Sequence, residues 1–225
     1  MNSTGVFPVN AVTDSFRHPE TCLIAGNGPS LADVRNDVLS QFITFGANRC
    51  YLKFEPTYYF LVDELLCKSN VIWSDEVNSL PSQKFIISEY ADKIEGSTPL
   101  NCVHRMGFSF EPLEHIYTYF SVVTAMLQIA YWMGFKRIGL VGLDHRFNEP
   151  RGTREWHPIN EDTNHFTKDY YTDYMTQWKA PRLDKLTEWL KRARSIFDKD
   201  GIEVINLTPG SALQTFPFGD LKDWI

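Results

Sequence analysis

A short segment near the amino terminus, Gly26-Asn27-Gly28-Pro29-Ser30, has the residue types of a loop that holds a phosphate group. Glycines let the main chain approach a ligand closely, and the first turn of a helix offers free N–H groups at its positive end. The segment is neither a Walker loop nor a complete GxGxxG fingerprint. It therefore predicts a nucleotide-phosphate site or a tight turn capped by Ser30, and Asn27 favours the former because a simple turn requires no such polar group.

Two aspartates, Asp63 and Asp144, each come directly after a predicted strand. Carboxylates in this position can contact ligand hydroxyls or bind a divalent metal ion, and they can also cap the strand end or form a surface salt bridge. Asp144 is followed by His145 and Arg146, at the start of a long segment without periodicity. This context favours a functional role for Asp144.

The segment from about residue 145 to 180 contains no clear strand and at most one short helix. Connections longer than about 12–15 residues are uncommon unless they are functional or disordered. We predict that this segment is a mobile lid that orders over a bound ligand. Within it, His165 is a candidate general base, because imidazole exchanges protons near neutral pH, although a single histidine can also serve structure alone. Arg146, Arg151 and Arg154 could neutralise a diphosphate, or they could lie on a solvated loop among glutamates.

Alternating strands and helices must position these residues. Apolar, β-branched and aromatic runs predict strands at residues 21–25, 42–45, 57–62, 84–88, 137–141 and 202–205. Helices are predicted at residues 31 to about 39 with Ser30 as N-cap, at 119–134 as an interior helix, and at 183–197 with one apolar face. This order indicates an α/β, Rossmann-like fold with a mostly parallel sheet and helices on both faces. Ligands bind at the carboxyl ends of such strands, so the GNGPS loop, Asp63 and Asp144 should converge.

Composition indicates one α/β domain over residues 1–225, with an irregular lead-in over 1–20 and the lid over about 145–180. The chain of 225 residues is 43% hydrophobic, which is enough for one sizeable core. Its net charge of -6 gives no support to nucleic-acid binding. The four cysteines form no CxxC pair, so neither zinc nor a disulfide framework is expected. Neither a secretion signal nor an apolar run of membrane-spanning length is present, so we expect a soluble, cytoplasmic protein.

The segment from Ile24 to Leu31 resembles the opening motif of bacterial sialyltransferases of glycosyltransferase family 42, which use CMP-sialic acid. Weaker similarities follow in the same order over residues 21 to about 217: Asn48-Arg49-Cys50-Tyr51, the interior helix before Gly134-Phe135-Lys136-Arg137-Ile138, Gly142-Leu143-Asp144, and Thr208-Pro209-Gly210-Ser211-Ala212-Leu213. The same skeleton recurs in a broader group related to 6-hydroxymethylpterin diphosphokinase. Asn164-His165-Phe166 and the TPGSALQTFP ending are more similar to that group, some of whose members accompany surface-sugar biosynthesis.

The resemblance implies roles for particular residues. Those expected to hold the nucleotide and its phosphates are Gly26, Asn27, Gly28, Ser30 and Asn48, with Ser121 facing the nucleotide from the start of the interior helix. The sialyltransferases stabilise the departing phosphate with tyrosines, and Arg146 stands where one of these would fall. Their catalytic histidine lies in the lid, and an ungapped match places it at Asp169, with His165 four residues earlier. The resemblance therefore leaves His165 and Asp169 as alternative bases.

Three hypotheses follow. The first is a glycosyltransferase-like enzyme that moves a sugar from a nucleotide-activated donor, in particular a CMP-sugar, to a saccharide acceptor in surface-glycan synthesis, with no required cofactor. The second is a diphosphokinase that transfers diphosphate from ATP to a hydroxymethyl-pterin-like substrate, with Mg²⁺ held by Asp63 and Asp144. The third is a nucleotide-binding or scaffold protein without catalytic activity.

Overall fold

A parallel sheet of seven strands is the framework of the protein. The computed structural model describes residues 20–68, 75–148, 157–158, 162–171, 177–178 and 181–225. The strand order is β11-β8-β1-β2-β3-β4-β5, and every neighbouring pair is parallel. The strands are β1 (Thr21–Ala25), β2 (Ile43–Ala47), β3 (Tyr58–Leu61), β4 (Gln83–Ile87), β5 (Thr98–Leu100), β8 (Arg137–Val141) and β11 (Glu203–Asn206). The predicted α/β fold with a mostly parallel sheet is confirmed.

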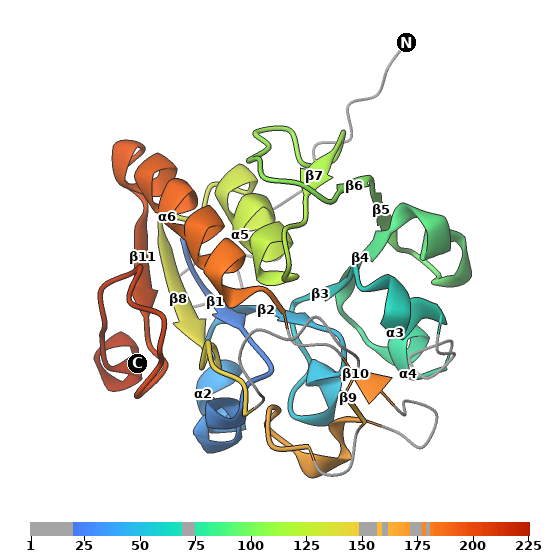
Figure 1. The fold of residues 1–225 in the computed structure, drawn as a ribbon, viewed down its shortest axis with the longest axis horizontal. Helices are drawn as coiled ribbons and strands as arrows, with labels where there is room; N and C mark the ends of the chain where they lie inside the picture. The colour runs from blue at the N-terminus through green and yellow to red at the C-terminus, as the bar shows by residue number, and fades with distance from the viewer. Residues whose placement is uncertain (1–19, 69–74, 149–156, 159–161, 172–176, 179–180) are drawn as a thin grey trace.

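Both faces of the sheet are covered, so its central strands are apolar along their whole length. In β1, Cys22 and Ile24 pack into the core on one face, whereas Leu23 and Ala25 pack into the core on the other. The first core lies under α5 (Val123–Trp132) and α6 (Leu183–Lys199), which run side by side across the sheet in Figure 1. The second core lies under α2 (Asn36–Leu39), α3 (Glu64–Lys68), α4 (Asp75–Ser79) and the short 3-10 helices η1 (Pro29–Asp33), η2 (Cys50–Leu52), η3 (Ser88–Lys93) and η5 (Leu221–Trp224).

The predicted interior helix is present as α5, in which eight of ten residues are buried. Its one buried amide, Gln128, is fully hydrogen-bonded: Oε1 accepts from the main-chain N–H of Ser109, and Nε2 donates to the carbonyl oxygens of Tyr117 and Thr124. These bonds compensate the cost of burying the amide and attach the preceding loop to the helix. None of the helices in the described ranges has the length and hydrophobicity needed to cross a membrane.

The prediction of one helix over residues 31 to 39 is wrong. The chain forms the five-residue 3-10 helix η1, passes through an extended Val34, and then forms the four-residue helix α2. Gly28 stands at the N-cap position of η1, and the side chain of Ser30 is bonded elsewhere. Pro29 starts the turn, but no capping side chain extends it into an α-helix.

Two pairs of short strands, one of them within the predicted lid, were not predicted from the sequence. The small strands are β6 (Cys102–Val103) paired with β7 (Ile116–Tyr117), and β9 (His157–Pro158) paired with β10 (Gln177–Trp178). The lid also contains the 3-10 helix η4 (Lys168–Tyr170). Residues 1–19 of the predicted lead-in, which covers residues 1–20, and much of the lid lie outside the described residues.

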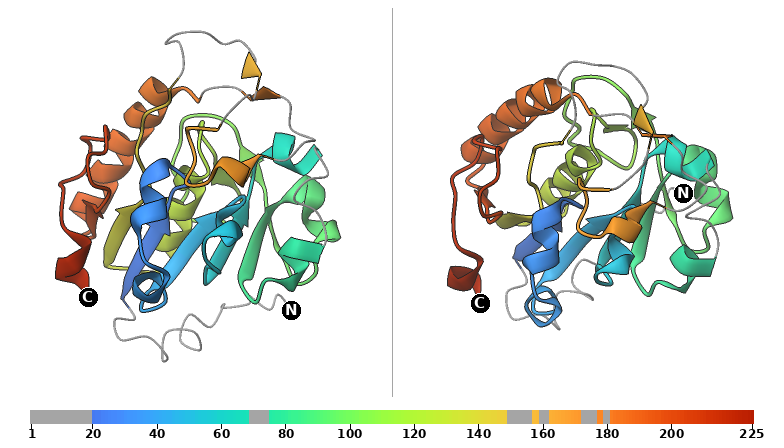
Figure 2. Two further views of the ribbon diagram at one scale, coloured as in Figure 1. Left: turned by 90° about the horizontal axis from the view of Figure 1, so that it is seen from below. Right: turned by 60° about the horizontal axis from the view of Figure 1, so that its bottom comes forward.

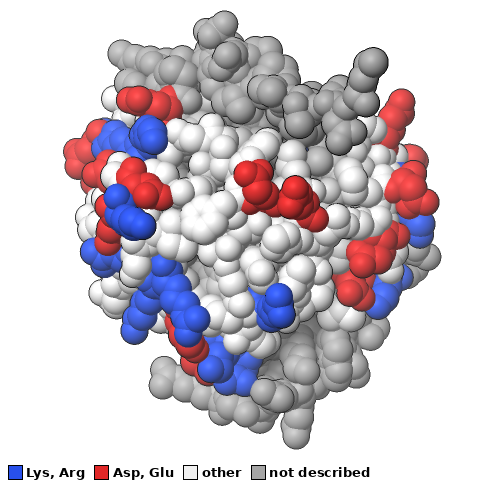
Figure 3. All heavy atoms as spheres, turned by 90° about the horizontal axis from the view of Figure 1, so that it is seen from above, with Lys and Arg blue, Asp and Glu red and all other residues white. Residues whose placement is uncertain are grey.

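The face at the amino ends of the strands, seen in Figure 3, has a largely uncharged centre with a small acidic group. Lys and Arg side chains on this face lie mainly towards its margin, with Asp and Glu side chains close to them. An extended basic surface of the kind that binds nucleic acid is therefore absent from the described part of this face.

Candidate functional site

A cavity of about 450 Å³ lies at the carboxyl edge of the sheet. The ends of β1, β2, β3 and β8, the start of α5 and the segment 162–171 surround it, and the left view of Figure 2 looks onto this edge. The predicted site residues that line it are Gly26, Asn27, Gly28, Asn48, Asp63, Ser121, Asp144, Arg146 and His165. The strand ends therefore converge as predicted, whereas Ser30 and Asp169 do not line the cavity.

The loops after β1 and β8 fit together through their glycines. The N–H of Gly26 donates to the carbonyl oxygen of Val141 at 2.8 Å, and that of Gly28 donates to the carbonyl oxygen of Gly142 at 3.0 Å. A Cβ atom on Gly28 would lie only 2.1 Å from Oδ2 of Asp144. The close packing of the two loops thus requires glycine at these positions. The sequence motif alone did not reveal this requirement.

Asp144 binds the start of η1. Its Oδ2 accepts from the hydroxyl of Ser30 at 2.7 Å and from the N–H of Ser30 at 3.2 Å. The prediction that Ser30 is an N-cap is therefore wrong, because its hydroxyl donates to a carboxylate. The start of a helix attracts anions, and at the start of η1 this place is taken by the carboxylate of Asp144. A ligand phosphate in the cavity has to be held by other groups.

Two asparagine side chains from neighbouring strand ends carry unpartnered oxygens. Asn27 donates from Nδ2 to the carbonyl oxygen of Ala47 and to the hydroxyl of Tyr170, each at 3.0 Å. Its Oδ1 and that of Asn48 are buried without a hydrogen-bond partner among the described residues. Buried polar atoms in folded proteins are nearly always paired, so these two acceptors, on side chains that line the cavity, fit donors of a bound ligand.

The cavity lining also contains residues with a strained backbone conformation. Among the described non-glycine residues, three have a positive φ: Asn48 at 55°, Phe120 at 59° and His145 at 54°. All three line the cavity. Left-handed conformations cost free energy and persist where the surrounding structure imposes them, as is common at binding sites.

One described segment of the predicted lid, residues 162–171, is fixed to the loops after β1 and β2. The N–H of Phe166 donates to the carbonyl oxygen of Asn27 at 3.1 Å. The buried guanidinium of Arg49 donates from Nη1 to the carbonyl oxygens of Asp169 at 3.0 Å and Tyr170 at 2.6 Å. Residues 162–171 therefore form a wall of the cavity. The rest of the predicted lid lies largely outside the described residues, and its mobility stays a prediction.

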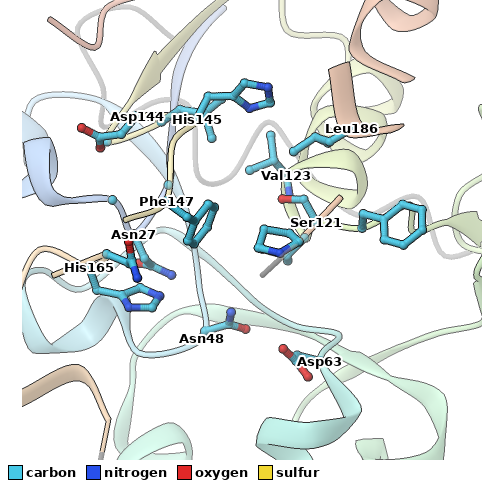
Figure 4. Close-up of a pocket in the computed structure, with 18 of the residues that line it drawn as sticks. Asn27, Asn48, Asp63, Ser121, Val123, Asp144, His145, Phe147, His165 and Leu186 are labelled. Atoms are coloured by element: carbon cyan, nitrogen blue, oxygen red, sulfur yellow. The ribbon is translucent and has the colours of Figure 1, made fainter. Parts of the chain in front are cut away.

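His165 stands in this wall with its imidazole held on several sides. Its ring stacks on Tyr170 at a centroid distance of 3.7 Å and lies perpendicular to Tyr171. Nδ1 is 2.8 Å from Oδ2 of Asp162, and Nε2 has no hydrogen-bond partner in the described ranges. Figure 4 shows the ring beside Asn27 at the cavity. Asp169 is exposed and lies outside the cavity lining, so of the two alternative bases only His165 faces the cavity.

Burial raises the pKa of the Tyr170 phenol well above its usual range, with a further contribution from Tyr171. The phenol therefore stays protonated, and its oxygen accepts the hydrogen bond from Asn27. Burial also lowers the pKa of His145, whose Nε2 is 2.8 Å from the hydroxyl of Thr187 on α6. A neutral His145 thus attaches the loop after β8 to α6.

Arg146 is the sole Lys or Arg among the described residues of the cavity lining. Its side chain is exposed, and its Nη2 donates to the carbonyl oxygen of Gly210 in the late TPGS loop. No carboxylate of the described residues forms an ion pair with it. A single accessible guanidinium of this kind can interact with one phosphate group.

Asp63 and Asp144 do not form a shared metal site. Asp63 caps α3, where its Oδ1 accepts from the N–H groups of Leu65 at 2.9 Å and Leu66 at 3.4 Å. Asp144 is bonded to Ser30, and Figure 4 shows the two carboxylates on opposite sides of the cavity. The described residues contain no cluster of three or more potential metal ligands. Two separate carboxylates, one capping α3 and the other bonded to Ser30 in the loop after β1, do not fit the joint Mg²⁺ ligation expected for a diphosphokinase.

The opposite wall of the cavity is mostly apolar. Val123 on α5 and Leu186 on α6 belong to this wall, and Phe147 projects towards the centre in Figure 4. Ser121, two residues before α5, accepts at Oγ from the N–H of Val123 at 3.3 Å. A mostly apolar wall with a few placed polar groups is typical of small-molecule sites.

Three residues important to this geometry, Asp162, Tyr170 and Arg49, were not predicted as site residues. The spacing of Asp162 and His165 was visible in the sequence, but a spacing of three residues outside a helix does not predict contact. Arg49 and Tyr170 meet across about 120 residues of chain, which no local pattern reveals.

Comparison with solved structures finds sialyltransferases of Campylobacter jejuni among chains of similar arrangement. The sialyltransferase CstII, solved with the substrate analogue cytidine-5'-monophosphate, is 16% identical over 88% of this chain and 84% of its own, with a TM-score of 0.48. The monofunctional alpha-2,3-sialyltransferase Cst-I is 18% identical over 90% of this chain and 81% of its own, with a TM-score of 0.43. No protein-family model and no curated protein sequence matches the chain. At these identities and TM-scores the likeness carries no weight for function, which rests on the cavity itself.

Proposed function

We propose that the chain is a glycosyltransferase-like enzyme that takes a sugar from a nucleotide-activated donor, in particular a CMP-sugar, and passes it to a hydroxyl of a saccharide acceptor in surface-glycan synthesis. The observation that carries this proposal is the pair of unpartnered acceptors, Oδ1 of Asn27 and Oδ1 of Asn48, beside an imidazole whose Nε2 is free. Neutral amide oxygens accept hydrogen bonds from hydroxyl and amino groups. A ribose provides hydroxyl groups, and a cytosine provides an amino group. The GNGPS motif, with its resemblance to sialyltransferases, supports the same nucleotide class.

The charges around the cavity support a donor with a single phosphate. The described lining contains one guanidinium, that of Arg146, together with Asp63, Glu64 and Asp144. A triphosphate placed there would meet three carboxylates and one arginine, and its repulsion would need compensation by metal ions. A CMP-sugar carries one phosphate, so Arg146 and neutral donors can stabilise the leaving group.

In the proposed reaction, an acceptor hydroxyl attacks the anomeric carbon of the donor while His165 takes the hydroxyl proton at Nε2. The bond between the anomeric carbon and the phosphate oxygen breaks, and its electron pair leaves with CMP. General base catalysis of this kind contributes about 10²–10⁴ in rate. The apolar wall formed by Val123, Leu186 and Phe147 limits the access of water to the reacting atoms.

Replacing Asn48 by Gly should weaken CMP binding by about 3- to 10-fold, because one hydrogen bond contributes about 0.5–1.5 kcal/mol. Glycine keeps the positive φ of 55° without strain, so the free energy of unfolding should change by less than about 1 kcal/mol. A substitution of Asn27 would be harder to interpret, because its Nδ2 also donates to the carbonyl oxygen of Ala47 and to the hydroxyl of Tyr170. Calorimetric titration with CMP measures the affinity, and denaturant unfolding gives the control. Unchanged affinity in a stable Asn48→Gly protein would remove Asn48 from the binding site.

Release of CMP from CMP-sialic acid should continue in EDTA, because the proposed leaving group is stabilised by Arg146 and not by a metal ion. Arg146→Ala should lower the rate by about ten- to hundredfold, since it removes the guanidinium facing the phosphate. Asp63→Asn should stay within about threefold of wild type, because an amide oxygen can still accept the α3 N–H bonds. Turnover of ATP in place of CMP-sialic acid would favour diphosphoryl transfer, if that turnover strictly requires Mg²⁺ and is lost in Asp63→Asn.

A further inference from the structure

We infer that Asp162 is a positioning residue for His165. It holds the imidazole in the tautomer with the proton on Nδ1, so that Nε2 can act as the base at the cavity. This inference rests on the proposed transferase function. Asp162 has a side chain that is 1% exposed, and both of its carboxylate oxygens lie near Nδ1 of His165, at 2.8 and 3.1 Å. The side chain of His165 itself is 15% exposed. The pair is therefore largely removed from water, on the side of the cavity that also holds Asn27.

The chemistry of the two groups decides where the ring proton lies. An ionised carboxylate only accepts hydrogen bonds, so Nδ1 of the neutral imidazole must carry the proton that it donates to Asp162. The lone pair of the neutral ring is then on Nε2, the nitrogen without a partner among the described residues. When Nε2 takes a proton from an acceptor hydroxyl, the positive charge forms next to the carboxylate, which stabilises it.

Asp162 is itself held in place by the main chain. Its Oδ1 also accepts from the N–H of Asn164 at 2.9 Å, and Oδ1 of Asn164 accepts from the N–H of Asn148 at 2.8 Å. The loop after β8 is thereby joined to the segment that carries the base. The carboxylate therefore has two separable contacts, one with the turn at Asn164 and one with the ring of His165.

The rings of Tyr170 and Tyr171 fix the remaining freedom of the imidazole. Tyr170 lies parallel to it with an interplanar angle of 3°, and Tyr171 lies across it at 89°. The hydroxyl of Tyr170 accepts from Nδ2 of Asn27, whose Oδ1 is one of the two unpartnered acceptors. The groups around the ring, which are Asp162, Tyr170 and Tyr171, thus place the base relative to the loop proposed to bind the nucleotide.

The substitution Asp162→Asn separates the two contacts of the carboxylate. The new amide oxygen can still accept from the N–H of Asn164, so the turn is kept. The amide nitrogen then faces Nδ1 of His165 and donates to it, which moves the ring proton to Nε2. The base is lost although the side chain keeps its size. We expect the rate of CMP release from CMP-sialic acid at saturation to fall by about 10²–10⁴-fold, with CMP affinity and the KM for the donor within about threefold.

The exposed Asp33 provides the matched control, because Asp33→Asn makes the same chemical change outside the cavity lining and should keep the wild-type rate. Nitrogen chemical shifts of ¹⁵N-labelled histidine report the ring tautomer without any turnover. In its neutral form, the His165 ring should carry its proton on Nδ1 in wild type and on Nε2 in Asp162→Asn. The signal is assigned by its loss in His165→Gln.

A rate in Asp162→Asn within threefold of wild type, or a wild-type ring with its proton on Nε2, would overturn the inference. The tautomer change together with the loss of rate supports it. If the tautomer changes as expected but wild type releases no CMP from CMP-sialic acid, the positioning of His165 by Asp162 is supported and the transferase proposal fails.

Discussion

His165→Gln is expected to lower the rate of CMP release from CMP-sialic acid by about 10²–10⁴-fold, with CMP affinity within about threefold of wild type. Glutamine can occupy much of the space of the imidazole, but it cannot take up a proton near neutral pH. Binding should persist because the proposed nucleotide contacts are those of Asn27 and Asn48. The comparison of turnover, measured in EDTA, with calorimetric binding of CMP therefore separates chemistry from binding.

Two further substitutions sharpen this test. His115→Gln changes a histidine that packs against Tyr117 away from the cavity lining, so it should retain the wild-type rate. Asp169→Asn addresses the other base implied by the family resemblance, and its exposed position outside the lining predicts little effect. A large loss of rate in Asp169→Asn together with a small loss in His165→Gln would reverse the assignment of the base.

Gly142→Ala should destabilise the protein by about 2–4 kcal/mol, which combines the strain of a positive φ with overpacking of a closed site. Gly142 has a φ of 65°, and a Cβ atom there would lie 2.5 Å from the carbonyl oxygen of Gly26 and 2.9 Å from Cβ of Leu31. The first of these atoms belongs to the main chain, which cannot move away without breaking the contact between the two loops. A protein of this size should lose roughly 5–15 °C in Tm.

Gly201 offers a matched control for this substitution. Its φ of 68° is nearly the same, and a Cβ atom there would have no neighbour within 4 Å. Gly201→Ala should therefore show the cost of the backbone conformation alone, about 1 kcal/mol. Denaturant unfolding of both variants measures the difference between them. Equal losses of stability would mean that the contact between the loops after β1 and β8 does not require glycine at position 142.

The sheet was predictable because its central strands are buried on both faces and are therefore apolar throughout. The runs at residues 21–25 and 137–141 coincide with β1 and β8. The convergence of the GNGPS loop, Asp63 and Asp144 around one cavity followed from the geometry of parallel strands, whose carboxyl ends share one edge. These features depend on local patterns and on general rules of α/β topology.

The roles of individual polar residues were less predictable, because they depend on contacts between distant parts of the chain. Ser30 has the type and position of an N-cap, but its hydroxyl is bonded to Asp144, 114 residues later. The glycines of the GNGPS loop suggested close approach of a phosphate, whereas Gly28 is in contact with Asp144 and Gly142. A local motif indicates that a side chain or glycine is needed there, and only the fold shows what it contacts.

The pairing of Asp162 with His165 illustrates the same limit within a single segment. Residues three apart meet reliably on a helix, but these two lie before η4 in a stretch without regular structure. Their contact depends on the fixation of the segment by Asn27 and Arg49. The histidine was therefore predictable as a candidate, whereas its carboxylate partner was not.

Calorimetric titration of the whole chain with CMP in the presence of EDTA tests the central claim most directly, namely that the cavity holds a cytidine nucleotide without a metal ion. We predict saturable binding of one CMP per chain, weakened by about 3- to 10-fold in Asn48→Gly and unchanged when Mg²⁺ replaces EDTA. An absence of CMP binding in EDTA, with ATP binding that appears only with Mg²⁺, would contradict the account.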